Sequence, residues 1–225
     1  MPHHIARKMP GTEEPKEKGA YQCMGLDDAA FIHPESVLAK TQPEFVVYQE
    51  LIETTKPYMR GVTAIEAEWL AEILPQLCTF SKPLELPGPT YQQDSGKVYC
   101  HMTATFGRNG WTLPALSKEY PKSVDKCRWF ARYLLEGLVI PDMKKYTQFL
   151  LSPPSTMIKA WAKLQPRTEK LLGQLVAKGV DSREALLQEW KQDQKYLLAA
   201  YCDWLHRDKH AELMAAWPPG HMESV

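Results

Sequence analysis

The chain has 225 residues, of which 44% are hydrophobic and 24% are charged, and its formal net charge is zero. This length accommodates one or two domains with a sizeable core, and no apolar run approaches the roughly 18 residues typical of a membrane span. Zero net charge argues against a protein that coats nucleic acid by bulk electrostatics, so any binding of RNA depends on a local patch.

The cysteines and the first residues point to a reducing compartment. Residues 1–4 contain neither an apolar core nor a cleavage-like site, so we expect no secretory signal. The five cysteines are widely spaced and form no Cys-x-x-Cys pair. Such an odd, dispersed set favours buried thiols over a disulfide framework or a zinc site.

The motifs of nucleotide hydrolysis are missing from the chain. It contains no Gly-x-x-x-x-Gly-Lys-Ser/Thr loop, no acidic box for magnesium and no Gly-x-Ser-x-Gly elbow. His206 and His210 are four residues apart, but without a His-Glu-x-x-His pattern or a cysteine pair they indicate a surface pair rather than metal ligands. We therefore expect no catalytic residue, metal ion or cofactor in this chain.

The N-terminal part of the chain predicts short β-strands. Their expected ranges are 5–9, 20–24, 29–33, 45–53 and 58–65. In 45–53, β-branched and aromatic residues occupy both faces, which indicates burial on both sides. Five short strands separated by turn signals suit a closed or nearly closed Greek-key barrel.

Helical spacing then replaces the strand period. The apolar residues of 66–77 predict a helix that Pro75 ends or distorts. The segment 81–96 is rich in proline, glycine and polar residues and is interpreted as a linker or loop. Alternating residues over 98–106, followed by a glycine-containing turn, predict a β-hairpin.

From residue 123 onward, apolar stripes predict a series of helices. The second of them is expected over 157–164, Gly179 is expected to cap the third, and Asp181 with Glu184 forms a capping box for the fourth. Basic residues also follow helical spacing, and the acidic residues among them favour solvated helix faces. These basic stripes comprise Lys122, Lys126, Arg128 and Arg132 in one group, and Lys159, Lys163, Arg167 and Lys170 in the other.

Two groups of residues are candidates for binding. Hydroxyl and ammonium groups in the loop Thr54-Thr55-Lys56 can donate hydrogen bonds to phosphates or base edges, with Tyr58 and Arg60 close by, although an ordinary polar hairpin loop has the same composition. Seven tryptophans is a high count for this length. Most are expected in the core, and the candidates for an exposed partner-binding anchor are Trp204 and Trp217.

The segment from residue 31 to residue 65 also resembles a known family. The motifs FIHPESVL, PEFVVYQE, TTKPYMR and VTAI are similar, in order and spacing, to the C-terminal OB-fold of DEAH-box RNA helicases. The resemblance implies an RNA-facing role for Thr54, Thr55 and Lys56, and more weakly for Tyr58 and Arg60. Pro57 stands where the family often has an acidic residue. Proline stiffens the loop and removes a backbone hydrogen-bond donor.

The expected fold is therefore α+β. It comprises an OB-type five-stranded β-barrel with a flanking helix over 1–80, a linker or loop over 81–96, and a β-hairpin plus a mostly helical C-terminal domain over 97–225. The segments TMIKAWAKLQPRTEKLL and YLLAAYCDWL resemble the extended tail of a nucleolar family member that acts in small-subunit ribosome assembly.

This second resemblance implies a function for the chain. It would be the auxiliary, non-catalytic C-terminal module of an ATP-dependent RNA helicase in the nucleus and nucleolus, acting in pre-rRNA processing and release of U3 small nucleolar RNA. ATP and Mg²⁺ would belong to motor domains in cis. Its partners would be pre-rRNA, small nucleolar RNA, and pre-ribosome proteins or a protein activator. No binding to a membrane is expected. Two alternatives stay open: a protein-interaction scaffold without RNA contact, and a free-standing single-stranded nucleic-acid-binding OB protein.

Overall fold

A computed structural model describes residues 4–10, 19–26, 28–161 and 165–219 of the chain. The chain divides into two compact units, and the long hairpin contributes to both. The first unit comprises 1–82 with 102–116, and the second comprises 83–101 with 117–225. The units are thus discontinuous in sequence, unlike the consecutive domains expected over 1–80 and 97–225.

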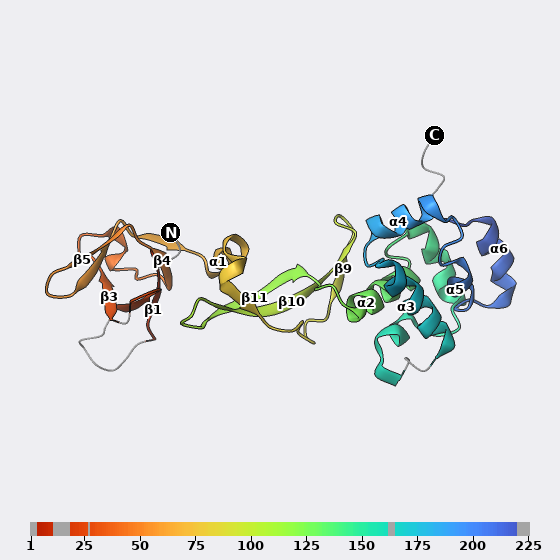
Figure 1. Cartoon of the computed structure of the whole chain (residues 1–225), viewed down its shortest axis with the longest axis horizontal. Coiled ribbons are helices and arrows are strands. Elements are labelled where there is room, and N and C mark those ends of the chain that lie inside the picture. Colours follow the sequence, from red (N-terminus) through yellow and green to blue (C-terminus); the bar gives the residue numbers. More distant parts are fainter. Residues whose placement is uncertain (1–3, 11–18, 27, 162–164, 220–225) are drawn as a thin grey trace. The chain divides into compact units, whose positions relative to one another are not determined.

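The first unit is built on a seven-stranded sheet (Figure 1). The strand order is β5-β6-β3-β2-β1-β4-β7. The strands are β1 (Ile5–Lys8), β2 (Ala20–Cys23), β3 (Ala29–Ile32), β4 (Phe45–Val47), β5 (Glu50–Glu53), β6 (Pro57–Arg60) and β7 (Thr63–Ile65).

The predicted number of strands is wrong, although all five predicted segments form strands. The segment 45–53 divides into β4 and β5 because its two halves pair with different neighbours: β4 pairs with β1 and β7, while β5 pairs with β6. The segment 58–65 divides into β6 and β7 at Gly61, whose φ of +62° does not continue a strand. The expected α+β class with an OB-type barrel stands.

Alternation along the strands separates the barrel interior from its outer face. Ala6, Val46 and Met59 are buried in one cluster with Tyr21 and Cys23, which is the interior. The residues next to them in the chain point outward. The predicted packing of both faces holds for β4, where Phe45 lies in a second cluster on the outer face. In β5, Leu51 and Ile52 are only half-buried and the two glutamates are exposed.

That second cluster covers the outer face at the β1–β4–β7 end of the sheet. Helix α1 (Ala67–Ile73) contributes Leu70, and the end of the hairpin contributes Trp111, whose Nε1 donates to Gln22 Oε1 at 2.7 Å. Helix α1 is shorter than predicted, and two residues of its predicted apolar stripe, Trp69 and Ile73, are exposed. A 3₁₀ turn over Pro75–Leu77 follows it, since proline cannot continue the helical hydrogen bonds.

The hairpin belongs to a second, four-stranded sheet. Strands β10 (Lys97–Phe106) and β11 (Trp111–Glu119) confirm the predicted hairpin, and β8 (Cys78–Phe80) and β9 (Thr90–Gln92) both pair with β10. The segment 81–96, interpreted as a linker or loop, is a loop over most of its length and carries the short strand β9. Besides carrying β9, this segment runs along β10, and the amide of Leu84 donates to the carbonyl of His101 at 2.8 Å.

Helices make up most of the second unit and surround one apolar cluster (Figure 1). The predicted helix over 157–164 is a short 3₁₀ segment at its start, and its last three residues lie outside the described residues. The α-helices are α2 (Val124–Leu135), α3 (Pro166–Lys178), α4 (Arg183–Gln192), α5 (Leu198–Cys202) and α6 (His210–Ala215), with 3₁₀ segments at Val37–Ala39 in the first unit and at Pro141–Phe149, Pro154–Ile158 and Arg207–Lys209. Among the described residues, no helix has both the length and the apolar character needed to cross a bilayer.

The capping of α3 and α4 differs in part from the prediction. Gly179 ends α3 in the left-handed conformation, as predicted. The residue that caps α4 is Ser182, whose hydroxyl accepts a hydrogen bond from the amide of Ala185 at 3.3 Å. The predicted capping box is wrong because Asp181 is held by an ion pair instead.

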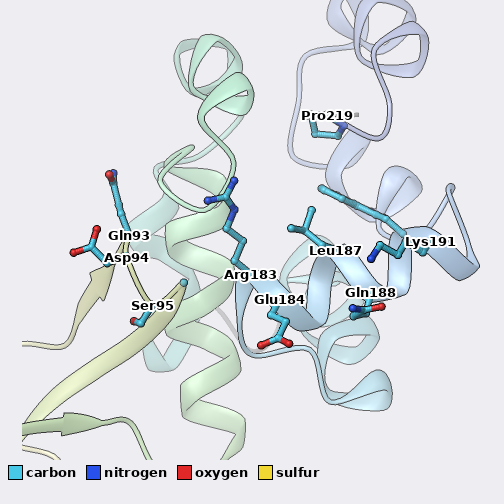
Figure 2. Close-up of a pocket in the computed structure, with 11 residues that line it drawn as sticks. Gln93, Asp94, Ser95, Arg183, Glu184, Leu187, Gln188, Lys191 and Pro219 are labelled. Carbon is cyan, nitrogen blue, oxygen red and sulfur yellow. The ribbon is translucent and has the colours of Figure 1, made fainter. Parts of the chain in front are cut away.

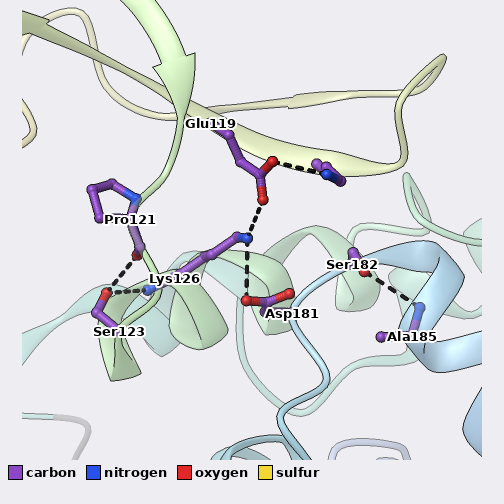
Figure 3. A network of polar contacts seen from close by, with 8 residues as sticks. Glu119, Pro121, Ser123, Lys126, Asp181, Ser182 and Ala185 are labelled. Atoms are coloured by element: carbon purple, nitrogen blue, oxygen red, sulfur yellow. Dashed lines mark hydrogen bonds and ion pairs between the residues drawn. The ribbon is translucent and has the colours of Figure 1, made fainter. Parts of the chain in front are cut away.

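That ion pair belongs to a charged network inside the second unit (Figure 3). The ammonium of Lys126, a residue that is only 1% exposed, lies 2.7 Å from Glu119 and 3.1 Å from Asp181. Glu119 also pairs with Lys97 at 2.8 Å. The network joins the end of β11 to α2 and to the segment before α4. Lys126 was expected on a solvated basic stripe, and the structure corrects this.

A pair of glycine substitutions tests the helix ending. Gly179→Ala is expected to destabilise the protein by about 1 kcal/mol, because Gly179 has a φ of +65°, which strains any residue with a side chain. A Cβ at this position would have no neighbouring atom within 4 Å, so no steric clash adds to that cost. Gly173→Ala, within α3 and equally free of neighbours, is expected to stabilise it by roughly 0.5–1 kcal/mol. Thermal unfolding of both variants measures this. Equal effects of the two substitutions would contradict the assignment.

Candidate functional site

The predicted RNA-binding loop connects β5 to β6 on the surface of the first unit. Thr54, Thr55 and Lys56 are all exposed. The loop is tight because the amide and the hydroxyl of Thr54 both approach the carbonyl of Lys56, at 3.2 and 3.5 Å. The hydroxyl of Thr54 therefore donates within the loop, and the side chains of Thr55 and Lys56 are the ones presented to solvent.

The loop lies beside a row of aromatic side chains. Strand β3 runs parallel to β6, which places Phe31 opposite Tyr58 with their ring centroids 6.4 Å apart. The Lys56 ammonium lies 4.3 Å from the centroid of the Phe31 ring, a cation–π distance. His33 contacts the Tyr58 ring edge-on at 5.7 Å.

Arg60 lies on the same outer face as Tyr58. Side chains alternate along a strand, and Met59 between them is fully buried in the barrel interior. Arg60 is exposed. We call Phe31, His33, Lys56, Tyr58 and Arg60 the β3–β6 patch. The structure thus brings three of the predicted RNA-binding residues together and adds two aromatic ones.

Sequence reasoning missed both Phe31 and His33 as site residues, although a turn histidine such as His33 is expected to form a structural hydrogen bond. That bond is present, since the amide of Glu35 donates to Nδ1 of His33 at 3.3 Å. The same ring also contacts Tyr58. The alternation of buried Ala30 and Ile32 was the available signal for an outward-facing Phe31, but the parallel pairing of β3 with β6 joins distant segments and has no local signature.

The β3–β6 patch has the composition of a single-strand-binding surface. Aromatic faces stack on bases whatever their sequence, and lysine and arginine neutralise phosphates. The three rings are half-buried, so each presents part of its surface to solvent. At the β1–β4–β7 end, α1 and the hairpin end pack against the outer face.

The predicted partner-binding tryptophans differ from each other. The expected exposure of Trp204 is wrong: it is 0% exposed in the core of the second unit, where its Nε1 donates to the carbonyl of Arg167 at 3.2 Å. The short helical segment around Trp204 led us to expect weak packing, but the core of the second unit surrounds this side chain. Trp217 is half-buried. Its ring contacts Trp190 edge-on and Tyr201 at a tilted angle. Partner binding by Trp217 stays a prediction.

The buried cysteines are poor candidates for reactive groups. Burial raises the pKa of the Cys23, Cys100, Cys127 and Cys202 thiols, which disfavours the nucleophilic thiolate. Nε2 of His210 lies 3.2 Å from the carbonyl of Leu205. Across the parts of the chain that the structure describes, no three His, Cys, Asp or Glu residues come together as metal ligands.

Comparison with known families agrees with these two units. Residues 1–77 match the family described as oligonucleotide/oligosaccharide-binding (OB)-fold, and residues 142–221 match the family described as DEAH helicase DHX37 C-terminal domain. The chain therefore belongs with the C-terminal regions of DEAH-box RNA helicases, as the motifs from residue 31 to residue 65 predicted. Within this class, its second family match is specific to the DHX37 type.

Several relatives match nearly the whole chain, and three of them illustrate the similarity. It is 51% identical to the probable ATP-dependent RNA helicase DHX37 of Homo sapiens, over 96% of the chain and 19% of that protein. It is 38% identical to the putative ATP-dependent RNA helicase rha-2 of Caenorhabditis elegans, over 92% of the chain and 18% of that protein. It is 36% identical to the probable ATP-dependent RNA helicase kurz of Drosophila melanogaster, over 97% and 19%. The chain spans about a fifth of the length of these relatives.

Proposed function

We propose that this chain guides single-stranded RNA across the β3–β6 patch, as the auxiliary C-terminal module of an ATP-dependent RNA helicase. The observation that carries the proposal is the contact of Lys56, Phe31 and Tyr58 on one open face. Stacking is worth about 1–3 kcal/mol per base, which is enough for a weak, sequence-tolerant site. The module positions RNA and does not itself catalyse a reaction.

The finer parts of the proposal rest on the likeness to the helicase relatives. Motor domains in cis would bind ATP and Mg²⁺ and supply the force, because the chain itself has no phosphate-binding loop. We propose that the helicase acts in small-subunit ribosome assembly, with pre-rRNA and U3 small nucleolar RNA as substrates in the nucleolus, because the tail segments resemble those of a nucleolar family member. The second unit would dock pre-ribosome proteins or a protein activator.

Binding of a labelled oligouridylate to the 225-residue chain tests this function. Since Lys56 and Arg60 are the cations of the patch, we expect weak binding whose logarithmic salt slope is about −1.4, or −0.7 for each phosphate neutralised. Fluorescence anisotropy over a series of salt concentrations measures the slope. Absence of binding at low salt would favour a protein-interaction scaffold, and a much steeper slope would place the RNA on another, more basic surface.

A further inference from the structure

We propose that a cavity in the second unit binds an extended acidic peptide with an apolar side chain at its centre. The cavity has a volume of about 460 Å³ and lies between the turn that joins β9 to β10, helix α4 and Pro219 (Figure 2). Its volume is within the range of specific ligand pockets. It is separate from the β3–β6 patch and does not depend on RNA binding.

The two main walls of this cavity are fixed to each other by the backbone. The amide of Arg183 donates to the carbonyl of Gly96 at 2.8 Å, and Lys97 pairs with Ser182 in an isolated bridge. Gly96 has a φ of +67°, and an ideal Cβ on it would lie only 2.9 Å from Cβ of Arg183. This close approach means that the cavity is preformed, which lowers the entropy that a ligand must lose on binding.

Two cations line the cavity without acidic partners. Arg183 and Lys191 are exposed, and neither forms an ion pair within the described residues. On the other side of α4, by contrast, Glu189 is paired with Lys178 at 3.2 Å. The cavity therefore has positive charge available for an anionic ligand.

Two acidic residues, Asp94 and Glu184, also line the cavity. Figure 2 shows the carboxylates of Asp94 and Glu184 pointing away from the space into which Arg183 projects. Asp94 lies on the β9–β10 turn, and Glu184 lies on the first turn of α4. The space is thus bounded by the guanidinium of Arg183, by apolar groups and by the uncharged polar residues Gln93, Ser95 and Gln188.

The apolar groups lie between the two cations. Arg183, Leu187 and Lys191 are spaced by one helical turn each along α4, so the cations are about 12 Å apart with Leu187 midway. Leu187 is 37% exposed, and Trp190 and Pro219 complete the apolar lining. An extended peptide covers about 3.3 Å per residue, so it would place acidic residues roughly four apart with an apolar residue between them.

This pattern favours a peptide over RNA as the occupant. A nucleic-acid strand presents a phosphate at every nucleotide, and the middle of this site is apolar rather than cationic. Desolvating phosphates against Leu187 and Pro219 would cost free energy without a compensating charge. A peptide with one apolar side chain between two carboxylates matches the site at each position.

Selection from a phage-displayed library of random linear peptides tests the proposal. The full 225-residue chain serves as bait, and the double variant Arg183→Glu/Lys191→Glu serves for counter-selection. We expect enrichment of sequences with Asp or Glu about four residues apart and Leu, Phe or Trp between them. Synthetic peptides of the enriched sequence should bind the double variant at least about tenfold more weakly than the wild-type chain.

Two controls make the outcome decisive. Lys122→Glu reverses an exposed charge outside the cavity and should leave peptide binding unchanged, and oligouridylate should not displace the peptide. Leu187→Ser should weaken binding of the peptide without changing the melting temperature of the protein. Selection of basic or neutral peptides, no enrichment at all, or displacement by RNA would overturn the proposal. Oligouridylate binding by the double variant reports on the β3–β6 patch, so the two proposals fail independently.

Discussion

Lys126→Met is expected to lower the free energy of unfolding of the second unit by about 3 kcal/mol, at the low end of the range for breaking a buried ion pair. The methionine retains the apolar stem of the lysine but removes the charge between Glu119 and Asp181. Asp181 would then lose this ion pair, and Glu119 would keep only its outer pair with Lys97. The low end applies because the side chains of Glu119 and Asp181 are 39% and 17% exposed and stay partly solvated. Urea denaturation followed by far-ultraviolet circular dichroism reports this unit, which holds most of the helices.

The matched control is Lys97→Met, which removes the outer pair with the same carboxylate, Glu119. The two side chains are 37% and 39% exposed, so the loss of their ion pair should destabilise the protein much less than the loss of Lys126. If the two substitutions destabilise the protein equally, burial of Lys126 is not what makes its contribution large.

The pH dependence of stability gives a second check on Lys126. The hydrogen bonds from Lys126, then from Lys97, hold the pKa of Glu119 below its ordinary value of 4.5. A lowered pKa in the folded state contributes stability that is present above the unfolded value and is lost as the pH falls through the folded value. The difference between the wild-type chain and Lys126→Met should therefore be largest near neutral pH and shrink below about pH 4.5. A constant difference across that window would contradict the assignment.

Tyr58→Ala is expected to weaken binding of single-stranded RNA by about tenfold or more, because one stacking contact is worth about 1–3 kcal/mol. The substitution also removes the ring that contacts Phe31 and His33. Tyr58→Phe keeps the ring and should retain binding within about twofold. Anisotropy of a labelled oligouridylate measures both variants, and equal losses would indicate that the hydroxyl, not stacking, matters.

Lys56 makes a separable contribution to the same binding. Lys56→Gln removes one phosphate-neutralising charge, so the logarithmic salt slope should become shallower by about 0.7. Lys82→Gln, in the segment after β8, is the control and should leave the slope unchanged. An equal change in both variants would mean that RNA responds to overall charge and not to the β3–β6 patch.

Local patterns were sufficient to predict most elements and the position of the loop. Alternation and helical spacing predicted the barrel segments, the hairpin and the left-handed Gly179 cap, since these depend on neighbouring residues. The family motifs implied an RNA-facing role for Lys56 and Tyr58, which stays a prediction; in the structure Lys56 is exposed and Tyr58 is half-buried.

What the sequence did not reveal depends on contacts between distant segments. The burial of Lys126 requires Glu119 and Asp181 to converge on it, and a basic stripe on a helix looks the same whether its lysine is solvated or paired. Trp204 is buried because α3 supplies the acceptor for its Nε1. Phe31 joined the candidate site only through the parallel pairing of β3 with β6.

Ultraviolet crosslinking of single-stranded RNA to the intact helicase, with mass-spectrometric mapping of the adducts, tests the central claim most directly. The β3–β6 patch predicts adducts at Phe31, His33 and the segment 54–60, with strong reduction by Tyr58→Ala. Adducts confined to the second unit, at residues 117–225, would contradict it, because the RNA would then follow a path that the open face of the barrel does not provide.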